Sequence, residues 1–116
     1  MTTTVSRVVV SEGYAKVATW GSLANGEAGV ALEENLWADR SVQVDGTFGV
    51  SGSVQLEGSN DGASWYVLTD GQGNPLVFAG AKIEAIAEIT RYVRPRITAG
   101  DGTTSLAINL FMRRSQ

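Results

Sequence analysis

The feature that most constrains this chain is the spacing of dipeptides that favour tight turns. In each of them an Asn or Asp precedes a Gly, so the Asx side chain can cap the turn while the glycine supplies a positive φ. The segments between these pairs are short and show almost no helical periodicity. The pattern predicts an all-β protein. The five pairs are Asn25-Gly26, Asp45-Gly46, Asp61-Gly62, Asp70-Gly71 and Asp101-Gly102.

Between the turns, apolar and polar residues alternate, as in strands that bury one face. Seven or eight short antiparallel strands in 116 residues are typical of a β-sandwich, and we expect a jelly-roll-like sandwich. It would form a single domain over residues 1–116, in which residues 1–12 are an N-terminal arm or an edge strand. Strands are predicted over residues 6–10, 14–20, 41–48, 53–57, 64–69, 76–78, 91–98 and 104–113.

Three places interrupt this pattern. Residues 81–89 are compatible with at most one helical turn, because Ile83, Ile86 and Ala87 follow i, i+3, i+4 spacing, or with an irregular strand. Residues 23–39 are predicted mainly as loop. Pro95 lies inside a predicted strand, which indicates a sheet edge or a bulge because proline has no amide donor.

The chain contains no Cys and no His. A thiol nucleophile, a disulfide and the commonest general base and metal ligand are therefore excluded. We expect no enzymatic activity, no cofactor and no metal site. The N-terminus lacks the basic and apolar regions of a signal peptide, and the longest aliphatic run, Val8-Val9-Val10, is far shorter than a bilayer span, so no membrane association is expected.

Charge is unevenly distributed in a chain whose formal net charge is −3. Residues 89–116 carry five of the nine basic side chains and a single acidic one, Asp101. This asymmetry indicates two complementary surfaces, as in a self-assembling protein, although arginines on strands also simply solvate an exposed face. An overall acidic chain is not expected to bind nucleic acid directly.

Within the basic segment, alternation places Tyr92, Arg94 and Arg96 on one face of a strand that begins near Arg91. Guanidinium groups in such a row bind carboxylates or phosphates bidentately. We expect an acidic protein partner here, such as the Glu-rich loop of a neighbouring subunit. The alternative is an ordinary solvated face.

Three tryptophans receive different predictions. Trp20 and Trp65 are assigned to the core, and Trp37, in a polar loop, is predicted to be a surface anchor. Residues 59–65 follow the pattern S-x-D-G-x-x-W and resemble a hairpin of discoidin-like carbohydrate-binding sandwiches. We expect a structural hairpin, with a ligand or metal loop as the alternative.

Strand and turn motifs follow one another over residues 40–49 (RSVQVDGTFG), 53–62 (SVQLEGSNDG), 68–76 (LTDGQGNPL), 91–98 (RYVRPRIT) and 100–104 (GDGTT). Together they resemble a family of small structural proteins encoded in the head gene clusters of tailed bacteriophages. The resemblance implies a head decoration, or cement, protein that is made in the host bacterial cytoplasm and binds the capsid exterior of the virion. Its partner would be the major capsid protein, and it would form a homo-oligomer, a trimer or a dimer.

In such a protein, the N-terminal valines would add a strand to a neighbouring subunit. One alternative is a carbohydrate-binding module for a host-surface glycan, for which Trp37 and Tyr66 would have to lie exposed and coplanar. Another is a tail or connector component. The residues predicted to form the partner interface are Val5, Val8, Val10, Trp37, Arg91, Tyr92, Arg94 and Arg96.

Overall fold

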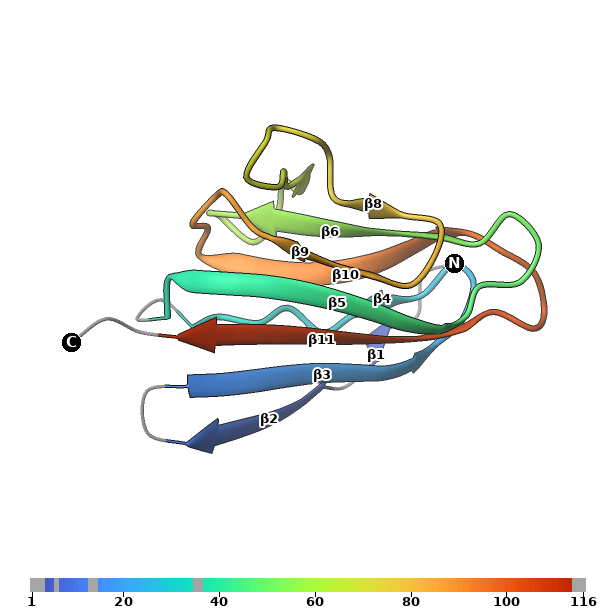
Figure 1. Cartoon of the computed structure of the whole chain (residues 1–116), viewed down its shortest axis with the longest axis horizontal. Helices are drawn as coiled ribbons and strands as arrows, with labels where there is room; N and C mark the ends of the chain where they lie inside the picture. Colours follow the sequence, from blue (N-terminus) through green and yellow to red (C-terminus); the bar gives the residue numbers. More distant parts are fainter. Residues whose placement is uncertain (1–3, 6, 13–14, 35–36, 114–116) are drawn as a thin grey trace.

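Two β-sheets pack face to face, because the alternating apolar residues of each sheet point into the space between them (Figure 1). The computed structural model describes the backbone of residues 4–5 and 7–12, and describes residues 15–34 and 37–113 in full. Every regular element in these residues is a strand, which confirms the predicted all-β sandwich. Among the same residues, no helix is long and apolar enough to cross a membrane.

The first sheet has five strands, and every neighbouring pair in it is antiparallel. Its central strand is the last strand of the chain, and its two edges are β2 and β9. In spatial order the strands are β2 (Arg7–Glu12), β3 (Ala15–Leu23), β11 (Ser105–Arg113), β5 (Asp39–Thr47) and β9 (Lys82–Ala85).

The second sheet has six strands and is antiparallel except for the parallel pair of β1 and β4. Two short strands, β7 and β8, both pair with β6. In spatial order the strands are β1 (Thr4–Val5), β4 (Ala28–Gly29), β10 (Tyr92–Ala99), β6 (Ser53–Ser59) and β7 (Tyr66–Val67), with β8 (Val77–Phe78) beside β6.

The order of the strands is that of a jelly roll, as predicted. Early strands pair with late ones: β3 with β11 in one sheet and β4 with β10 in the other. The next strands along the chain, β5 and β6, pair with the other sides of β11 and β10. A hairpin-like ribbon that folds over in this way closes two sheets around one core.

Residues 81–89, for which the sequence allowed two alternatives, and the predicted loop over residues 23–39 both contain strands. Residues 82–85 form the edge strand β9, so the strand alternative holds over those residues. The predicted loop over residues 23–39 contains the two-residue strand β4, and β5 already begins at Asp39. Such short strands carry too few residues for alternation to be visible in the sequence.

Pro95 lies in a central strand, next to an irregularity rather than at an edge. Val93 exchanges main-chain hydrogen bonds with Leu32, and the Ile97 amide donates to the Glu27 carbonyl. Pro95 lies between Val93 and Ile97 in the strand, and its backbone nitrogen faces the same side as their amides. The pairing of Leu32 with Val93 is shifted by one residue from that of Ala28 with Arg96. The missing amide donor therefore faces an interruption of the ladder, where no partner loses a bond.

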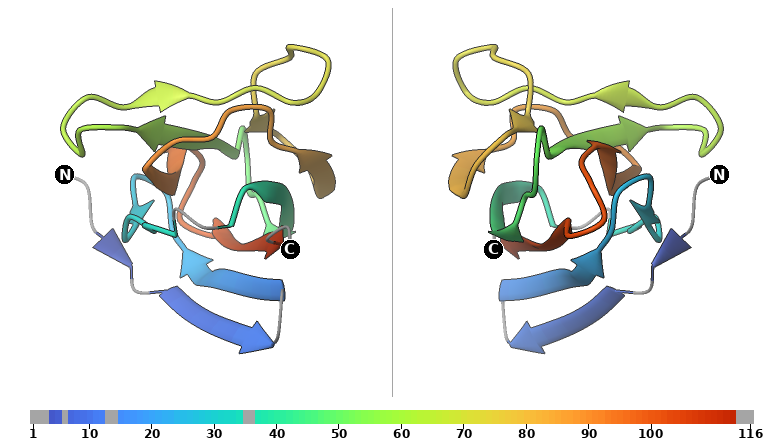
Figure 2. Two further views of the ribbon diagram at one scale, coloured as in Figure 1. Left: turned by 90° about the vertical axis from the view of Figure 1, so that its left-hand side faces the viewer. Right: turned by 90° about the vertical axis from the view of Figure 1, so that its right-hand side faces the viewer.

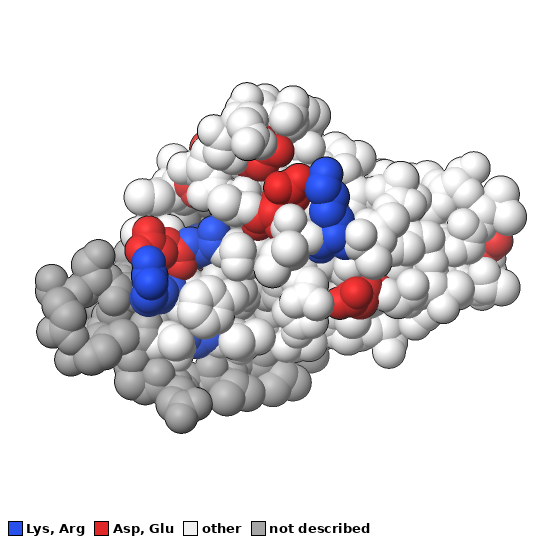
Figure 3. Space-filling model, viewed as in Figure 1, with Lys and Arg blue, Asp and Glu red and all other residues white. Residues whose placement is uncertain are grey.

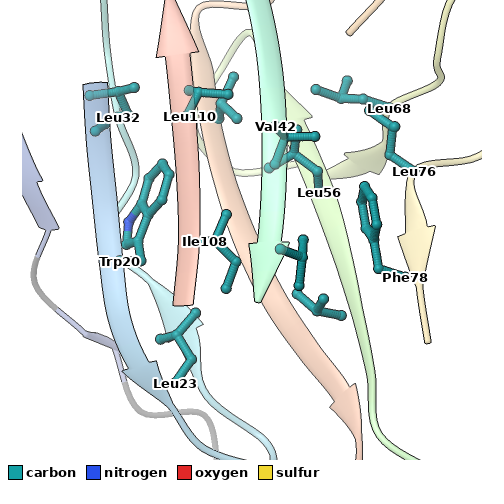
Figure 4. Close-up of a cluster of buried hydrophobic side chains, with 14 of the residues drawn as sticks. Trp20, Leu23, Leu32, Val42, Leu56, Leu68, Leu76, Phe78, Ile108 and Leu110 are labelled. Carbon is teal, nitrogen blue, oxygen red and sulfur yellow. The ribbon is translucent and has the colours of Figure 1, made fainter. Parts of the chain in front are cut away.

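The core fills the space between the sheets with aliphatic side chains from β3, β5, β6, β10 and β11 (Figure 4). Trp20 is fully buried, as predicted, and its indole N–H donates to the Val30 carbonyl at 2.8 Å. It packs against β4, where Gly29 leaves room for the ring. The alternation in β11 is also confirmed, since Leu106, Ile108, Leu110 and Met112 are all fully buried.

Candidate interaction surface

Charged and aromatic side chains cluster on the outer face of the six-stranded sheet. They come from β10, from β6 and from the turn between β6 and β7. In β10, Val93 is buried and Tyr92, Arg94 and Arg96 are half-buried on the opposite face, which is the arrangement predicted from the sequence. We call this surface the arginine face; it comprises Glu57, Trp65, Arg91, Tyr92, Arg94 and Arg96.

A buried carboxylate lies at the centre of the arginine face. The register places Arg94 opposite Glu57 and Arg96 opposite Gln55. The Nε atoms of Arg94 and Arg96 donate to the two oxygens of Glu57 at 3.0 and 2.8 Å, and Gln55 donates to one of them. Only 3% of Glu57 is exposed. Its carboxylate is therefore covered by its own partners.

These partners decide the ionisation of Glu57. Burial alone raises the pKa of this carboxyl group, because it disfavours the charged form. The hydrogen bonds from Arg96, Gln55 and Arg94 outweigh burial and lower the pKa below its ordinary value of 4.5. Glu57 is therefore a structural anion at neutral pH and has no proton to donate.

Aromatic rings hold the arginines in place. The guanidinium of Arg94 lies 4.1 Å from the centroid of the Trp65 ring, and the Trp65 ring is 6.5 Å from that of Tyr92. Arg91 lies 5.1 Å from the Tyr92 ring and binds Glu33 at 2.6 Å. Arg91 and Arg94 are thus oriented by aromatic rings before any partner arrives, and Arg96 is oriented by its bond to Glu57.

The predicted core position of Trp65 is wrong. Trp65 is half-buried and lies outside the cluster of buried core residues. The hairpin that carries it is held by its own polar atoms: Asp61 accepts hydrogen bonds from the amides of Ala63 and Ser64 at 2.8 Å each, and Gly62 has a φ of 76°. This is a structural turn, and it places the indole ring over Arg94.

The arginine face carries a surplus of positive charge. Arg94 and Arg96 share the single carboxylate of Glu57, and both use Nε for it, so their Nη groups take no part in these bonds. The two side chains are 26% and 39% exposed. A guanidinium with available Nη donors binds one further carboxylate or phosphate group.

The opposite face differs. Figure 3 shows the side of the molecule that carries β5, β9 and β11, where small groups of blue and red atoms are separated by uncharged surface. Two such pairs are Lys82 with Glu84 at 2.8 Å and Arg113 with Asp39 at 3.2 Å. Each of these two cations has its own carboxylate partner, unlike Arg94 and Arg96, which share one.

The predicted surface position of Trp37 is wrong. Only 6% of Trp37 is exposed, and the residue belongs to the core cluster. The polar residues around it bind one another: Arg40 donates to the carbonyls of Trp37 and Glu34 at 2.6 and 2.7 Å, and Lys16 binds Glu34 at 2.8 Å. These bonds hold the loop on the core and bring the Lys16 ammonium within 4.7 Å of the Trp37 ring centroid.

The N-terminal part of the predicted interface pairs within the chain. Val8 lies opposite Thr19 and Val10 opposite Val17, in the edge strand β2 of the five-stranded sheet. Val5 lies in β1, beside Gly29 of β4. The side chains of these three valines lie outside the described residues. Val8 and Val10 belong to the other sheet, so the structure does not bring them to the arginine face.

The predicted stacking platform of Trp37 and Tyr66 is not formed, because Trp37 is buried. Tyr66 is 72% exposed and lines a hollow of about 470 Å³ together with Asn60, Asp61 and Glu88. In the described residues, no group of three or more acidic side chains is placed to hold a metal ion.

Comparisons with known proteins find solved structures with a similar fold. No family model and no curated protein matches the sequence. The structure is similar to that of the SPBc2 prophage-derived protein YomS, with a TM-score of 0.59 and 10% sequence identity over 89% of this chain and 97% of that chain. It also matches protein NMB1881 from Neisseria meningitidis, with a TM-score of 0.44 and 10% identity over 92% and 82% of the two chains. The likeness to YomS shows that the β-sandwich fold is shared with a prophage-derived protein.

Proposed function

We propose that this chain is a non-enzymatic structural protein of a tailed-phage virion, a decoration protein that binds the outside of the head and bridges coat subunits. The observation that carries the proposal is the arginine face, an oriented surface with surplus positive charge in a chain whose net charge is −3. The resemblance of residues 40–104 to head-cluster proteins and the fold shared with prophage-derived YomS support the virion setting.

The state of the carboxyl groups supports a non-enzymatic role. Burial raises the pKa of Glu57 and Glu88, but the hydrogen bonds that each accepts outweigh it and lower both values. Backbone amides lower the pKa of Asp61 and Asp70, and the Thr103 hydroxyl and nearby amides lower that of Asp101 to about 2. A general acid needs a raised pKa. These five groups serve as acceptors in turns and between strands.

The arginine face suits an acidic surface on the coat. Trp65 and Tyr92 restrict the guanidiniums of Arg94 and Arg91, and Glu57 restricts that of Arg96, so less rotamer entropy is lost when a carboxylate binds. Each contact is modest, but a decoration protein is repeated over the shell and bridges two or more coat subunits. Repeated weak contacts give avidity without a high affinity for each copy.

Binding of the purified protein to expanded empty heads that lack it tests the proposal. We expect saturable cosedimentation that weakens as salt is added, because salt screens the contact between opposite charges. Arg96→Gln should bind about tenfold more weakly, the effect of losing one charge-assisted hydrogen bond. Mass spectrometry should also find the protein in virions, and labelling should place it on the head and not the tail.

Two matched variants separate the arginine face from a general charge effect. Arg113→Gln removes the same charge from the opposite sheet, where Arg113 is 65% exposed, and should bind as the unaltered protein does. Glu57→Gln raises the surplus charge of the face and should not weaken binding. Equal losses for Arg96→Gln and Arg113→Gln, or no binding to heads at all, would overturn the proposal.

A further inference from the structure

The five-stranded sheet ends in an open strand edge. Among the described residues, β9 pairs only with β5 in that sheet, and no strand follows it in the sheet order (Figure 2). Both Ile83 and Ala85 are exposed, Ile83 to 61%. An unpaired edge presents main-chain donors and acceptors that can pair with another strand.

The hydrogen-bond pattern identifies which residues face the open edge. The Ile86 amide donates to the Arg40 carbonyl at 3.1 Å, and the same register pairs Glu84 with Val42. Hydrogen-bonded pairs alternate along an antiparallel ladder. The amides of Lys82 and Glu84 therefore point toward β5, and those of Ile83 and Ala85 point away from it.

The open stretch is short. The Ala87 amide, which points the same way as that of Ile83, already donates to the Thr69 carbonyl at 2.9 Å. The edge is therefore covered from Ala87 onward. Ile83 and Ala85 are left with main-chain groups that face the open edge. Lys82 and Glu84, on either side of Ile83, form an ion pair at 2.8 Å.

We propose that a second copy of this chain pairs with β9 in antiparallel orientation about a two-fold axis, with Ile83 opposite the partner subunit's Ile83. In this register the two Ile83 residues exchange two main-chain hydrogen bonds. Lys82 then lies opposite the partner subunit's Glu84, and Glu84 lies opposite the partner subunit's Lys82. The five-stranded sheets of the two copies become one continuous sheet, and the two Ile83 side chains lie next to each other on its outer face.

Charge selects this register among those that the ladder allows. Residues whose main chain faces the open edge must pair with one another, so the register moves in steps of two residues. Moving one step along places Glu84 opposite the partner subunit's Glu84. Moving one step back places Lys82 opposite the partner subunit's Lys82. Like charges directly opposite destabilise a pair of strands, and opposite charges stabilise it.

The other edge of the same sheet has no such complementarity. β2 carries one basic and one acidic residue, Arg7 and Glu12. The main-chain groups of alternate residues point to opposite sides of a strand. Because Arg7 and Glu12 are five positions apart, the main chain of only one of them faces the open edge. A two-fold pairing of β2 with itself cannot place Arg7 opposite Glu12. Self-complementarity therefore favours β9 as the contact between copies.

Sedimentation equilibrium of the full chain over a range of concentrations tests the dimer. We expect a mass approaching twice the 12.2 kDa of one chain. The exchange of the Ile83 amide with solvent should slow as the concentration rises. Ile83→Pro should give a monomer, because it removes an amide donor that the internal ladder does not use. Ile89→Ser, which changes an exposed apolar residue away from the edge, should leave the dimer intact.

A charge exchange tests the register without altering the main chain. Lys82→Glu places like charges opposite each other twice and should raise the dissociation constant at least about tenfold. The double variant Lys82→Glu/Glu84→Lys restores opposite charges and should restore the dimer, even if Ile83→Pro does not fold. A chain that is monomeric at every concentration, or a dimer that Lys82→Glu leaves unchanged, overturns the inference. The assay contains no coat protein, so its failure is distinct from failure of the decoration role.

Discussion

Gly29→Ala should lower the free energy of unfolding by about 3 kcal/mol, a large effect for the addition of one methyl group. A Cβ at this position would lie 2.3 Å from Cδ1 and 2.5 Å from Nε1 of Trp20, and 2.9 Å from Cδ of Pro95. Trp20 is fully buried and its indole N–H is bonded to Val30, so the ring cannot move aside without breaking that bond. Urea unfolding followed by far-UV circular dichroism measures the loss.

Two further variants assign the loss to this contact. Gly80→Ala adds a methyl group where no atom lies within 4 Å, and it should change the free energy of unfolding only slightly. In Gly29→Ala/Trp20→Phe, the smaller ring leaves space for the added methyl group, so the double variant should lose less than the sum of the two single losses. Strictly additive losses would mean that Gly29 is required for another reason.

Glu57→Gln should cost about 2 to 3 kcal/mol of unfolding free energy. Removing one member of a buried ion pair costs about 3 to 5 kcal/mol, and the cost here lies at or just below the lower end of that range because Arg94 and Arg96 keep access to water. The amide that replaces the carboxylate can still accept a hydrogen bond, but it leaves both guanidiniums without a counter-charge. Asp39→Asn, at an ion pair whose side chains are 62% and 65% exposed, is the matched control and should change stability little.

The pH dependence of stability gives a second measure of Glu57. Its pKa in the folded protein lies below the ordinary 4.5 of the unfolded chain, so its contribution is fully present above pH 4.5. The contribution is lost as the pH falls from 4.5 through the folded pKa. The difference in unfolding free energy between the unaltered protein and Glu57→Gln should be constant near neutral pH and shrink in acid. A difference that does not change between neutral and acidic pH would contradict this account.

Local pattern in the sequence was sufficient for much of the fold. Alternation identified the long strands, and it placed Tyr92, Arg94 and Arg96 on one face because side-chain direction in a strand depends only on position. The tendency of aromatic residues to lie in the core of a small sandwich predicted the burial of Trp20 correctly and that of Trp65 wrongly. Four of the five Asx-Gly pairs lie in turns or bends, because the conformation there is decided by the residues themselves. The turn predicted at Asp45-Gly46 is wrong: both residues continue β5, where Gly46 lies opposite Leu106 and the strand pairing overrides the local turn preference.

What the sequence did not predict depends on contacts between distant segments. Glu57 is 37 residues from Arg94, and only the register of β6 against β10 brings them together. The burial of Trp37 was not predicted because its loop is polar in sequence. Lys16, which lies 18 residues before Glu34, neutralises the Glu34 carboxylate of that loop. Strands β4 and β9 form where a neighbouring strand passes, and their own residues carry too little pattern to indicate it.

The jelly-roll pairing has a consequence for how the chain folds during synthesis. β11 is the central strand of the five-stranded sheet, with β3 on one side and β5 on the other, yet it is the last strand to be made. Until Arg113 has left the ribosome, β3 and β5 have no strand between them and their apolar faces remain uncovered. Pairings between the ends of a chain close slowly, since a long loop must be ordered first. The nascent protein therefore completes its core only once β11 is available, and until then a chaperone that shields β3 and β5 would protect their apolar faces.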